Sequence, residues 1–277
     1  MAIYQLLKVL VDPNLRDHHK VCLDGIKYLV RNQPNCMPFM PMLIPPLMNL
    51  MKANDPYLTN SLFDCVNMII VYIPQAMLEF ADPIFDMLHI VIHLQPNLVI
   101  KLLAEINKRY KAKLFSHMYL MLPQVLSLIE HSRKIAEQNH LSYNQDISMQ
   151  KTRDLIQITR EAVYHLPMFD YQILDDHLYL IVPLLLRTAS HVRITPEFQD
   201  LNKVAIKTLN SVVNCSTFRE HTAQVVHQLL RLLDNLENES SIVDDIINSF
   251  CNIAIRLTSD FAPYTSLIQK AIRRNRL

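Results

Sequence analysis

Apolar residues recur along this chain with the three-to-four-residue spacing of an amphipathic helix. In residues 197–214 the positions i, i+3, i+4, i+7, i+8, i+11 and i+12 are Leu201, Val204, Ala205, Thr208, Leu209, Val212 and Val213. In residues 240–258 a similar stripe consists of Val243, Ile246, Ile247, Phe250, Ile253, Ala254 and Leu257. Each stripe is a wide helical face that must pack against neighbours. The pattern predicts an all-α chain without β-sheet.

A proline beside an apolar run marks a longer period of about 40 residues. The spacings between Pro41, Pro83, Pro123, Pro183 and Pro263 are 42, 40, 60 and 80 residues. The 80 is twice 40, and its midpoint falls in a similar run without proline. The 60 is 40 plus a polar insertion of about 20 residues. A period of this size in a helical sequence is typical of HEAT or armadillo repeats, which are helix pairs.

The two periodicities divide the chain into a leading helix and about six helix pairs. The leading helix, residues 2–11, looks like the last helix of an earlier repeat, so we expect the isolated chain to expose apolar surface. The expected pairs are 14–31 with 38–52, 57–73 with 79–94, 97–112 with 116–138, 149–166 with 171–190, 197–214 with 219–236, and 240–258 with 261–275. The repeats are therefore 14–52, 57–94, 97–138, 149–190, 197–236 and 240–275. Because one pair cannot bury two apolar stripes alone, we predict that residues 1–277 form a single right-handed α-solenoid.

Prolines are expected at helix starts, where their missing N–H costs nothing. Asp55-Pro56, Gln95-Pro96 and Thr195-Pro196 are expected to open first helices, and the recurring prolines to lie in or near the first turn of second helices. The polar residues 131–150 break the period, so we expect an inter-helix insertion there. Its most polar part, residues 137–146, is expected to be the most mobile internal segment.

Composition excludes several classes of protein. The single glycine, Gly25, cannot supply a dinucleotide fingerprint, a P-loop or a kinase glycine-rich loop. Hydrophobic content is 50%, charged content 19% and formal net charge +1, which supports an extensive core and gives no support for nucleic-acid binding. No apolar run is long enough to span a bilayer, and we expect neither membrane insertion nor a signal peptide.

The five cysteines are expected to be reduced and mostly buried thiols of a cytosolic protein. Their number is odd and none are paired as Cys-x-x-Cys; they are Cys22, Cys36, Cys65, Cys215 and Cys251. The clustered methionines Met37, Met40, Met42, Met48 and Met51 fit either an adaptable binding surface or, better, core filling.

The histidine and carboxylate clusters fit structural roles better than chemistry. His89 and His93 lie one helical turn apart, but no third metal ligand is evident. His18 and His19 diverge on a helix and are expected in an exposed or interfacial turn. The pairs Asp175-Asp176 and Asp244-Asp245 are each expected near a helix start, where the helix dipole favours acidic groups.

Basic residues gather at the end of the chain: Arg256, Lys270, Arg273, Arg274 and Arg276. They fit helix-dipole compensation better than a patch for an acidic partner or lipid headgroup. We therefore assign no catalytic residue, no cofactor-binding residue and no metal ligand, and we expect no cofactor.

Three segments carry a recognisable pattern. The opening, residues 2–19, has a helix, an Asp-x-x-Leu turn and a histidine-rich helix start. Residues 36–45 are Cys36-Met-Pro-Phe-Met-Pro-Met-Leu-Ile-Pro45, and residues 261–276 close the last repeat. In this order the segments resemble the start, the Cys-x-x-Phe-Leu-Pro-x-x-x-Pro segment and the closing element of the middle HEAT region of the target-of-rapamycin (TOR) Ser/Thr protein kinases, which belong to the PI3K-related kinases. The resemblance covers the whole chain, although the 131–150 insertion departs from the family pattern.

The resemblance implies a scaffold segment that precedes the catalytic domain of a much larger kinase. It implies as partners a second TOR copy and Raptor-like or Rictor-like subunits, in nutrient and growth signalling. The implied location is the cytoplasm, with recruitment to endolysosomal or vacuolar membranes through partners. No kinase catalytic residue maps onto this chain.

Three other functions remain open from the residues alone. An importin-like transport receptor would be expected to be acidic, which the net charge of +1 counts against. A phosphatase scaffold subunit would have more, and more regular, repeats. An enzyme with an unrecognised helical site would need a pocket that the sequence does not reveal.

Overall fold

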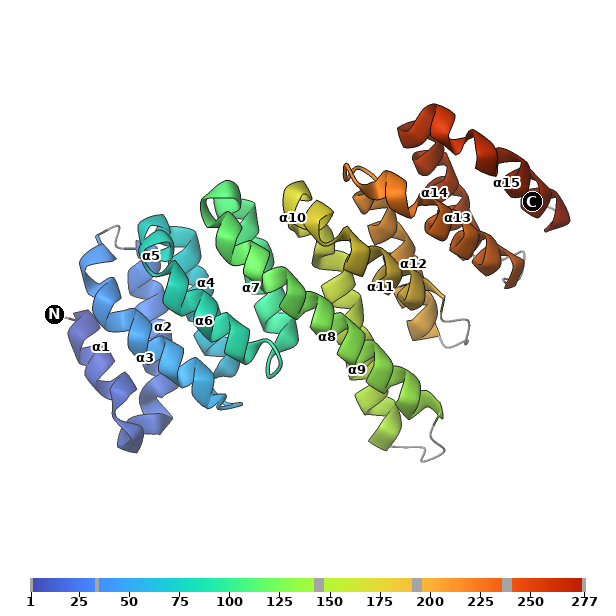
Figure 1. Cartoon of the computed structure of the whole chain (residues 1–277). Coiled ribbons are helices and arrows are strands. Elements are labelled where there is room, and N and C mark those ends of the chain that lie inside the picture. Colours follow the sequence, from blue (N-terminus) through green and yellow to red (C-terminus); the bar gives the residue numbers. More distant parts are fainter. Residues whose placement is uncertain (1, 33–34, 142–146, 191–195, 236–240, 276–277) are drawn as a thin grey trace. The chain divides into compact units, whose positions relative to one another are not determined.

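The computed structural model describes residues 2–32, 35–141, 147–190, 196–235 and 241–275 (Figure 1). Within these ranges every regular element is an α-helix or a short 3₁₀-helix, and no strand occurs. The all-α prediction is confirmed. None of the described helices is both long and apolar enough to cross a membrane.

The chain divides into two compact units, residues 1–124 and 125–277. The helices of the first unit follow closely the expected pairs, with one short addition, α5. They are α1 (Ala2–Val11), α2 (Arg16–Asn32), α3 (Met40–Ala53), α4 (Thr59–Tyr72), α5 (Pro74–Glu79), α6 (Ala81–Val91), α7 (Pro96–Tyr110) and the first part of α8 (Phe115–Leu141). Short 3₁₀ turns at Pro13–Leu15, Met37–Phe39 and Lys111–Leu114 lead into α2, α3 and α8.

The second unit repeats this plan with one broken helix. After the rest of α8 come α9 (Ile147–His165), α10 (Tyr171–Asp176), α11 (Leu178–Ala189), α12 (Pro196–Val212), α13 (Phe218–Asn235), α14 (Ser241–Leu257) and α15 (Ala262–Arg274). The expected helix 171–190 is split at His177, which separates α10 from α11. The buried His177 ring hydrogen-bonds through Nδ1 to the Ile173 carbonyl at 2.9 Å.

Helices in each unit contact helices two or three places further along the chain. In the first unit α2 contacts α4 and α4 contacts α7, while α1 contacts α3 and α3 contacts α6. In the second unit α9 contacts α12 and α12 contacts α14, while α11 contacts α13 and α13 contacts α15. Each unit therefore has one row of first helices and one row of second helices, as stacked helix pairs require.

The predicted apolar stripes face the core, with small departures. In α12 the residues Leu201, Ala205, Leu209 and Val212 are buried, whereas Val204 is only half-buried. In the α14 stripe, four of the seven predicted positions are buried; they are Val243, Ile246, Phe250 and Ile253. The others lie at the edges of the stripe, where side chains keep partial contact with solvent.

Some proline positions differ from the expectation. Pro41, Pro83 and Pro263 lie in first turns, but Pro123 and Pro183 lie inside α8 and α11. Interior prolines are tolerated here because tertiary packing of an apolar helix outweighs local propensity. Pro96 and Pro196 open α7 and α12 as expected, whereas Pro56 lies in the turn before α4. In that turn the Asp55 carboxylate accepts a hydrogen bond from the Tyr57 N–H at 3.0 Å.

The expectation of an inter-helix loop over residues 131–150 is wrong at both ends. Helix α8 continues to Leu141 and α9 starts at Ile147; residues 142–146 lie outside the described residues. Two causes extend α8. Arg133 forms ion pairs along its own helix with Glu130 and Glu137, and Ala136 joins a buried cluster with Ile156, Phe198 and Leu201. The polar composition hid an amphipathic continuation of the helix. The expected mobility of 137–146 stays a prediction.

Candidate interaction surface

Polar side chains connect segments that lie about 40 residues apart in the sequence. Arg16 contacts Asp55 at 2.6 Å, and the two positions are 39 residues apart. Arg219 contacts Asp260 at 3.0 Å, a separation of 41. Arg274 pairs with Asp234, a separation of 40. These contacts recur with the period of the prolines in the sequence, so each joins one helix pair to the next.

Two further contacts, each between a hydroxyl and a backbone carbonyl, replace a hydrogen-bond donor that a proline lacks. In α4 the Ile70 carbonyl would normally accept from residue 74, but Pro74 has no N–H. The buried Tyr110 hydroxyl, 40 residues further along in α7, donates to that carbonyl instead. Burial raises the pKa of the Tyr110 hydroxyl, so it stays protonated as a donor.

The second unit repeats this arrangement in α9. The Val163 carbonyl faces Pro167 at the i+4 position, which again has no N–H. The buried Thr208 hydroxyl of α12 donates to Val163 O at 3.1 Å. In both units, therefore, a hydroxyl on one first helix donates the hydrogen bond that is missing near the C-terminal end of the preceding first helix.

Asp175 caps a helix that starts 43 residues later. Its carboxylate accepts hydrogen bonds from Thr217 N at 2.9 Å, from Thr217 Oγ1 at 2.7 Å, and from Ser216 Oγ, just before α13. Burial raises the pKa of the Asp175 carboxyl, but these hydrogen bonds outweigh burial, and the net pKa is lowered. Asp175 and Asp176 end α10 and lie just before α11, so they are near a helix start as expected, although the first turn of α11 itself contains no acidic residue. Asp244, in contrast, lies in the first turn of α14 as expected.

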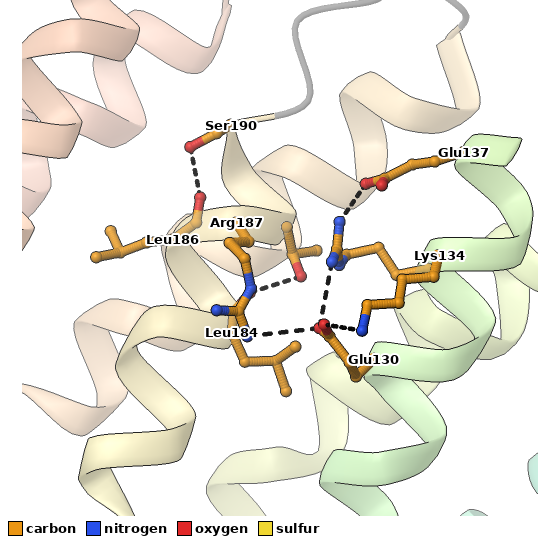
Figure 2. Close-up of polar contacts among 9 residues, drawn as sticks. Glu130, Lys134, Glu137, Leu184, Leu186, Arg187 and Ser190 are labelled. Atoms are coloured by element: carbon orange, nitrogen blue, oxygen red, sulfur yellow. Dashed lines mark hydrogen bonds and ion pairs between the residues drawn. The ribbon is translucent and has the colours of Figure 1, made fainter. Parts of the chain in front are cut away.

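An ionic cluster joins α8 to α11 in the second unit (Figure 2). Glu130 contacts Arg133 at 3.2 Å, Lys134 at 3.1 Å and Arg187 of α11 at 3.5 Å. Arg133 also pairs with Glu137, and its side chain is only 9% exposed. Burial raises the pKa of the Glu130 carboxyl, but the hydrogen bond from Lys134 and the nearby arginines outweigh it, so the net pKa is lowered. The cluster holds Glu130 ionised between two helices, which suits a structural role.

The structure gathers no metal site from the histidines. His89 is half-buried and His93 exposed, and in the described residues no group of three or more His, Cys, Asp or Glu side chains is placed to hold a metal ion. His18 is exposed, but His19 is buried, which the sequence did not predict. The His19 Nε2 lies 3.0 Å from the Asp12 carbonyl oxygen, because α2 turns this face toward the end of α1.

The cysteine prediction is confirmed for burial and for the absence of pairing. All five are free thiols; Cys22, Cys36, Cys65 and Cys215 are buried and Cys251 is exposed. Burial raises the pKa of Cys65 to about 12 and that of Cys215 to about 11. Both thiols are thus protonated at neutral pH and are poor nucleophiles.

The basic residues near the end of the chain are partly used within the protein. Besides the Arg274 pair with Asp234, Arg256 donates to the Asn214 carbonyl at 3.5 Å. Lys270 and Arg273 are exposed, and Arg276 lies outside the described residues.

A shallow groove of about 480 Å³ runs between α1 and α3 in the first unit. Its lining residues are Tyr4, Leu7, Lys8, Val11, Asp12, Pro13, Met42 and Pro46. Leu7 is buried and forms the floor, whereas Val11 is 62% exposed and Met42 48% exposed. Of the clustered methionines, Met40, Met48 and Met51 fill the core as expected, and Met42 lines this groove.

Sequence reasoning missed the groove and the contacts between helix pairs. The contacts had a usable signal: Arg16 and Asp55, and likewise Asp175 and Thr217, are polar residues one period apart. The groove had a weaker signal, since it depends on how closely α1 approaches α3.

Comparisons with known proteins agree with the sequence resemblance. Residues 1–73 match the family described as "Serine/threonine-protein kinase mTOR domain". Over 100% of its length the chain is similar to Serine/threonine-protein kinase TOR2 of Saccharomyces cerevisiae (22% identical over 281 residues) and to Serine/threonine-protein kinase mTor of Drosophila melanogaster (20% over 282). It is likewise similar to Serine/threonine-protein kinase TOR of Arabidopsis thaliana (22% over 289). The chain spans about a tenth of the length of these relatives, which is 10% of the first two and 11% of the third.

Proposed function

Because the chain is homologous over its whole length to the TOR kinases, we propose that it is a protein-interaction scaffold segment of such a kinase. Whole-length similarity to three TOR kinases, from a fungus, an insect and a plant, is the observation that carries this proposal. The described residues contribute no glycine-rich nucleotide cradle and no group of metal ligands. The role proposed is therefore assembly, and phosphoryl transfer belongs to the kinase domain of the parent protein.

We further propose that residues 1–277 stack as one HEAT-type α-solenoid. The rows of first and second helices in each unit, and the polar contacts at separations near 40, support this arrangement. In a solenoid each repeat contacts only its neighbours, which leaves long surfaces free for other proteins. The partners we propose are a second TOR copy and Raptor-like or Rictor-like subunits. The location proposed from the same homology is the cytoplasm, with recruitment to endolysosomal or vacuolar membranes through those partners.

The proposal is tested in the parent kinase with residues 1–277 deleted. We expect loss of partner assembly in a pull-down, while the kinase domain still phosphorylates a short peptide that needs no presentation by a subunit. Activity on the short peptide controls for general misfolding. Unchanged assembly after the deletion would refute the scaffold role.

A second variant avoids the deletion. The exposed apolar side chains Val21 and Tyr28 lie two turns apart on α2, at 69% exposure each, and can both be changed to Asp. Surface changes of this kind cost little stability. If the first-helix row is a contact surface, this variant weakens assembly without affecting short-peptide phosphorylation.

A further inference from the structure

The groove between α1 and α3 lies on the row of second helices. Helix α1 contacts α2 and α3, just as α11 contacts α12 and α13. By this pattern α1 occupies the place of a second helix, and α3 is the next second helix in the row. The groove is therefore a lateral furrow between two consecutive second helices, and it lies along the side of the stack.

The groove has a short apolar ridge on each side, and a proline makes the α3 side rigid. On α1, Tyr4 and Val11 lie two turns apart on one side; on α3, Met42 and Pro46 lie one turn apart on the other. Proline loses no side-chain freedom on binding, and methionine adapts to the shape of its partner. Two turns of helix extend roughly 10 Å, so the ridges match an amphipathic helix with apolar residues at i, i+3 or i+4, and i+7.

Two side chains of opposite charge line the groove, Lys8 and Asp12. The Lys8 ammonium lies 4.7 Å from the centre of the Tyr4 ring, and no carboxylate is paired with it in the described residues. The other charged group, Asp12, is already engaged, because its carboxylate accepts hydrogen bonds from Asn14 N at 2.9 Å and Asn14 Nδ2 at 3.0 Å. Because the Lys8 ammonium lies over the Tyr4 ring, an acidic residue on an incoming helix would pair with Lys8 at the Tyr4 end of the groove, away from the Asp12 carboxylate.

The α3 wall also has a backbone acceptor that its own helix cannot satisfy in the usual way. Pro46 has no N–H, so the Met42 carbonyl lacks its i+4 donor, and helical carbonyls point toward the residue four positions on. At Ile70 and Val163 the same loss is compensated by a hydroxyl from a neighbouring helix. Met42 and Pro46 both line the groove, so a ligand there can supply the donor.

We propose that this groove binds an acidic amphipathic helix of a partner protein. The apolar face of that helix packs on Tyr4, Val11 and Met42, a carboxylate pairs with Lys8, and a side-chain N–H or O–H donates to the Met42 carbonyl. A single lysine is too little positive charge for a nucleic acid or an anionic membrane, each of which needs several cations. The inference rests on the proposed scaffold function and names the chemistry of one partner.

The probe is a phage-displayed library of 16-residue peptides, selected on the complete 277-residue chain. Counter-selection uses the double variant Val11→Asp/Met42→Asp, whose helicity is checked by circular dichroism. We expect enriched peptides with apolar residues at i, i+3 or i+4, and i+7, and at least one Asp or Glu. In fluorescence anisotropy the double variant should weaken binding at least about ten-fold. Ile90→Asp, which changes a 51% exposed isoleucine of α6 that does not line the groove, should leave it unchanged.

Two further variants separate charge from shape. Lys8→Glu should weaken binding about five-fold, and a peptide with its acidic residue changed to Lys should recover the loss. Pro46→Ala restores an N–H for the Met42 carbonyl and should weaken binding about five-fold. The matched control Pro45→Ala restores an N–H one position away, outside the groove, and should have no effect.

Three results would overturn the inference: no enriched peptide, enriched peptides that bind the double variant equally well, or peptides without an acidic residue. A concentration-dependent dimer that Val11→Asp/Met42→Asp abolishes would place a second copy in the groove and would also overturn it. In each case the scaffold proposal still stands if partner assembly of the parent requires residues 1–277. If that assembly is independent of these residues, it is the scaffold proposal that fails.

Discussion

The two compact units use the same period but fill their cores differently. All seven buried methionines of the described residues lie in residues 1–124: Met40, Met48, Met51, Met77, Met87, Met118 and Met121. The buried polar and charged residues show the reverse distribution. Among the residues whose burial is described, three lie in the first unit, His19, Thr59 and Ser61, and ten in the second, including Arg133, His177, Thr208 and Ser249.

The difference indicates two ways of fixing the register of neighbouring helix pairs. Methionine packs adaptably, so the first unit relies on apolar volume. Buried hydrogen bonds and ion pairs are directional, so the second unit relies on specific partners such as Glu130 and Arg187 or Thr208 and Val163. The units should therefore respond differently to changes in volume and to changes in polarity.

The largest expected effect is the loss of apolar volume in the first unit. Leu47 of α3 is 0% exposed, and Leu47→Ala should lower the free energy of unfolding by about 3 kcal/mol, since the cavity adds to the lost transfer free energy. Urea denaturation measures the change, and hydrogen exchange locates it in α3 and its neighbours. The control Leu120→Ala removes a 61% exposed leucine of the same unit and should cost less than about 0.5 kcal/mol. Equal losses for the two variants would contradict the burial described for Leu47.

The next effect is the removal of a buried charge in the second unit. Arg133→Ala leaves Glu137 and Glu130 without their shared partner and should cost about 2–4 kcal/mol. The neighbouring Lys134→Ala removes a 59% exposed cation from the same cluster and should cost well under about 1 kcal/mol. Thermal or urea unfolding of the two variants measures both values. A loss for Lys134→Ala as large as for Arg133→Ala would show that the cluster acts through surface charge and not through burial.

A smaller, pH-dependent effect is expected at the Asp175 cap. Asp175→Ala should cost about 1 kcal/mol at pH 7, because Thr217 and Ser216 lose their acceptor. The pKa of this carboxyl is lowered in the folded protein, so its stabilisation is complete above the ordinary aspartate pKa of about 3.9 and is lost as the pH falls through the lowered value. The unfolding free energies of wild type and variant should therefore converge once the pH falls below the lowered pKa of this carboxyl.

The control for this prediction is the adjacent, exposed Asp176. Asp176→Ala should change stability little at any pH, since a surface substitution away from such contacts is nearly neutral. A difference between wild type and Asp175→Ala that persisted unchanged at acid pH would indicate that packing, and not the charged cap, explains the loss.

The smallest expected effects come from two substitutions that conserve the size of the side chain, one in each unit. Thr208→Val keeps the side-chain shape but leaves the Val163 carbonyl without its donor, and should cost about 1 kcal/mol. Met87→Leu keeps apolar volume at a 0% exposed position and should cost less. Paired urea titrations test the order. A larger loss for Met87→Leu would reverse the contrast drawn between the two units.

Periodicity predicted what depends on local sequence. The helix pairs and the stripe through Leu201 and Leu209 follow from residue order alone. The prediction of a loop over residues 131–150 was wrong because their polar composition was interpreted as that of a loop. In the structure Arg133 and Ala136 continue the buried face of α8. Surface polarity and helix periodicity coexist in an amphipathic helix, and the periodicity was the better guide.

Contacts between helices could not be predicted from the local pattern of apolar and polar residues. The position of His19 depends on the packing of α2 against the end of α1, and the pairing of Thr208 with Val163 depends on two first helices that the sequence separates by 45 residues. The groove likewise exists only because α1 and α3 are neighbours. The expected absence of catalytic, cofactor and metal residues stays a prediction.

The scaffold role is tested most directly by hydrogen–deuterium exchange of the parent kinase, alone and with its bound subunit. The account predicts that amides within residues 1–277 become protected when the subunit binds, with the protected peptides in helices that carry exposed side chains. Exchange in the kinase domain should change little by comparison. Protection confined to other parts of the parent, with every peptide of residues 1–277 exchanging as it does in the free kinase, would contradict the account.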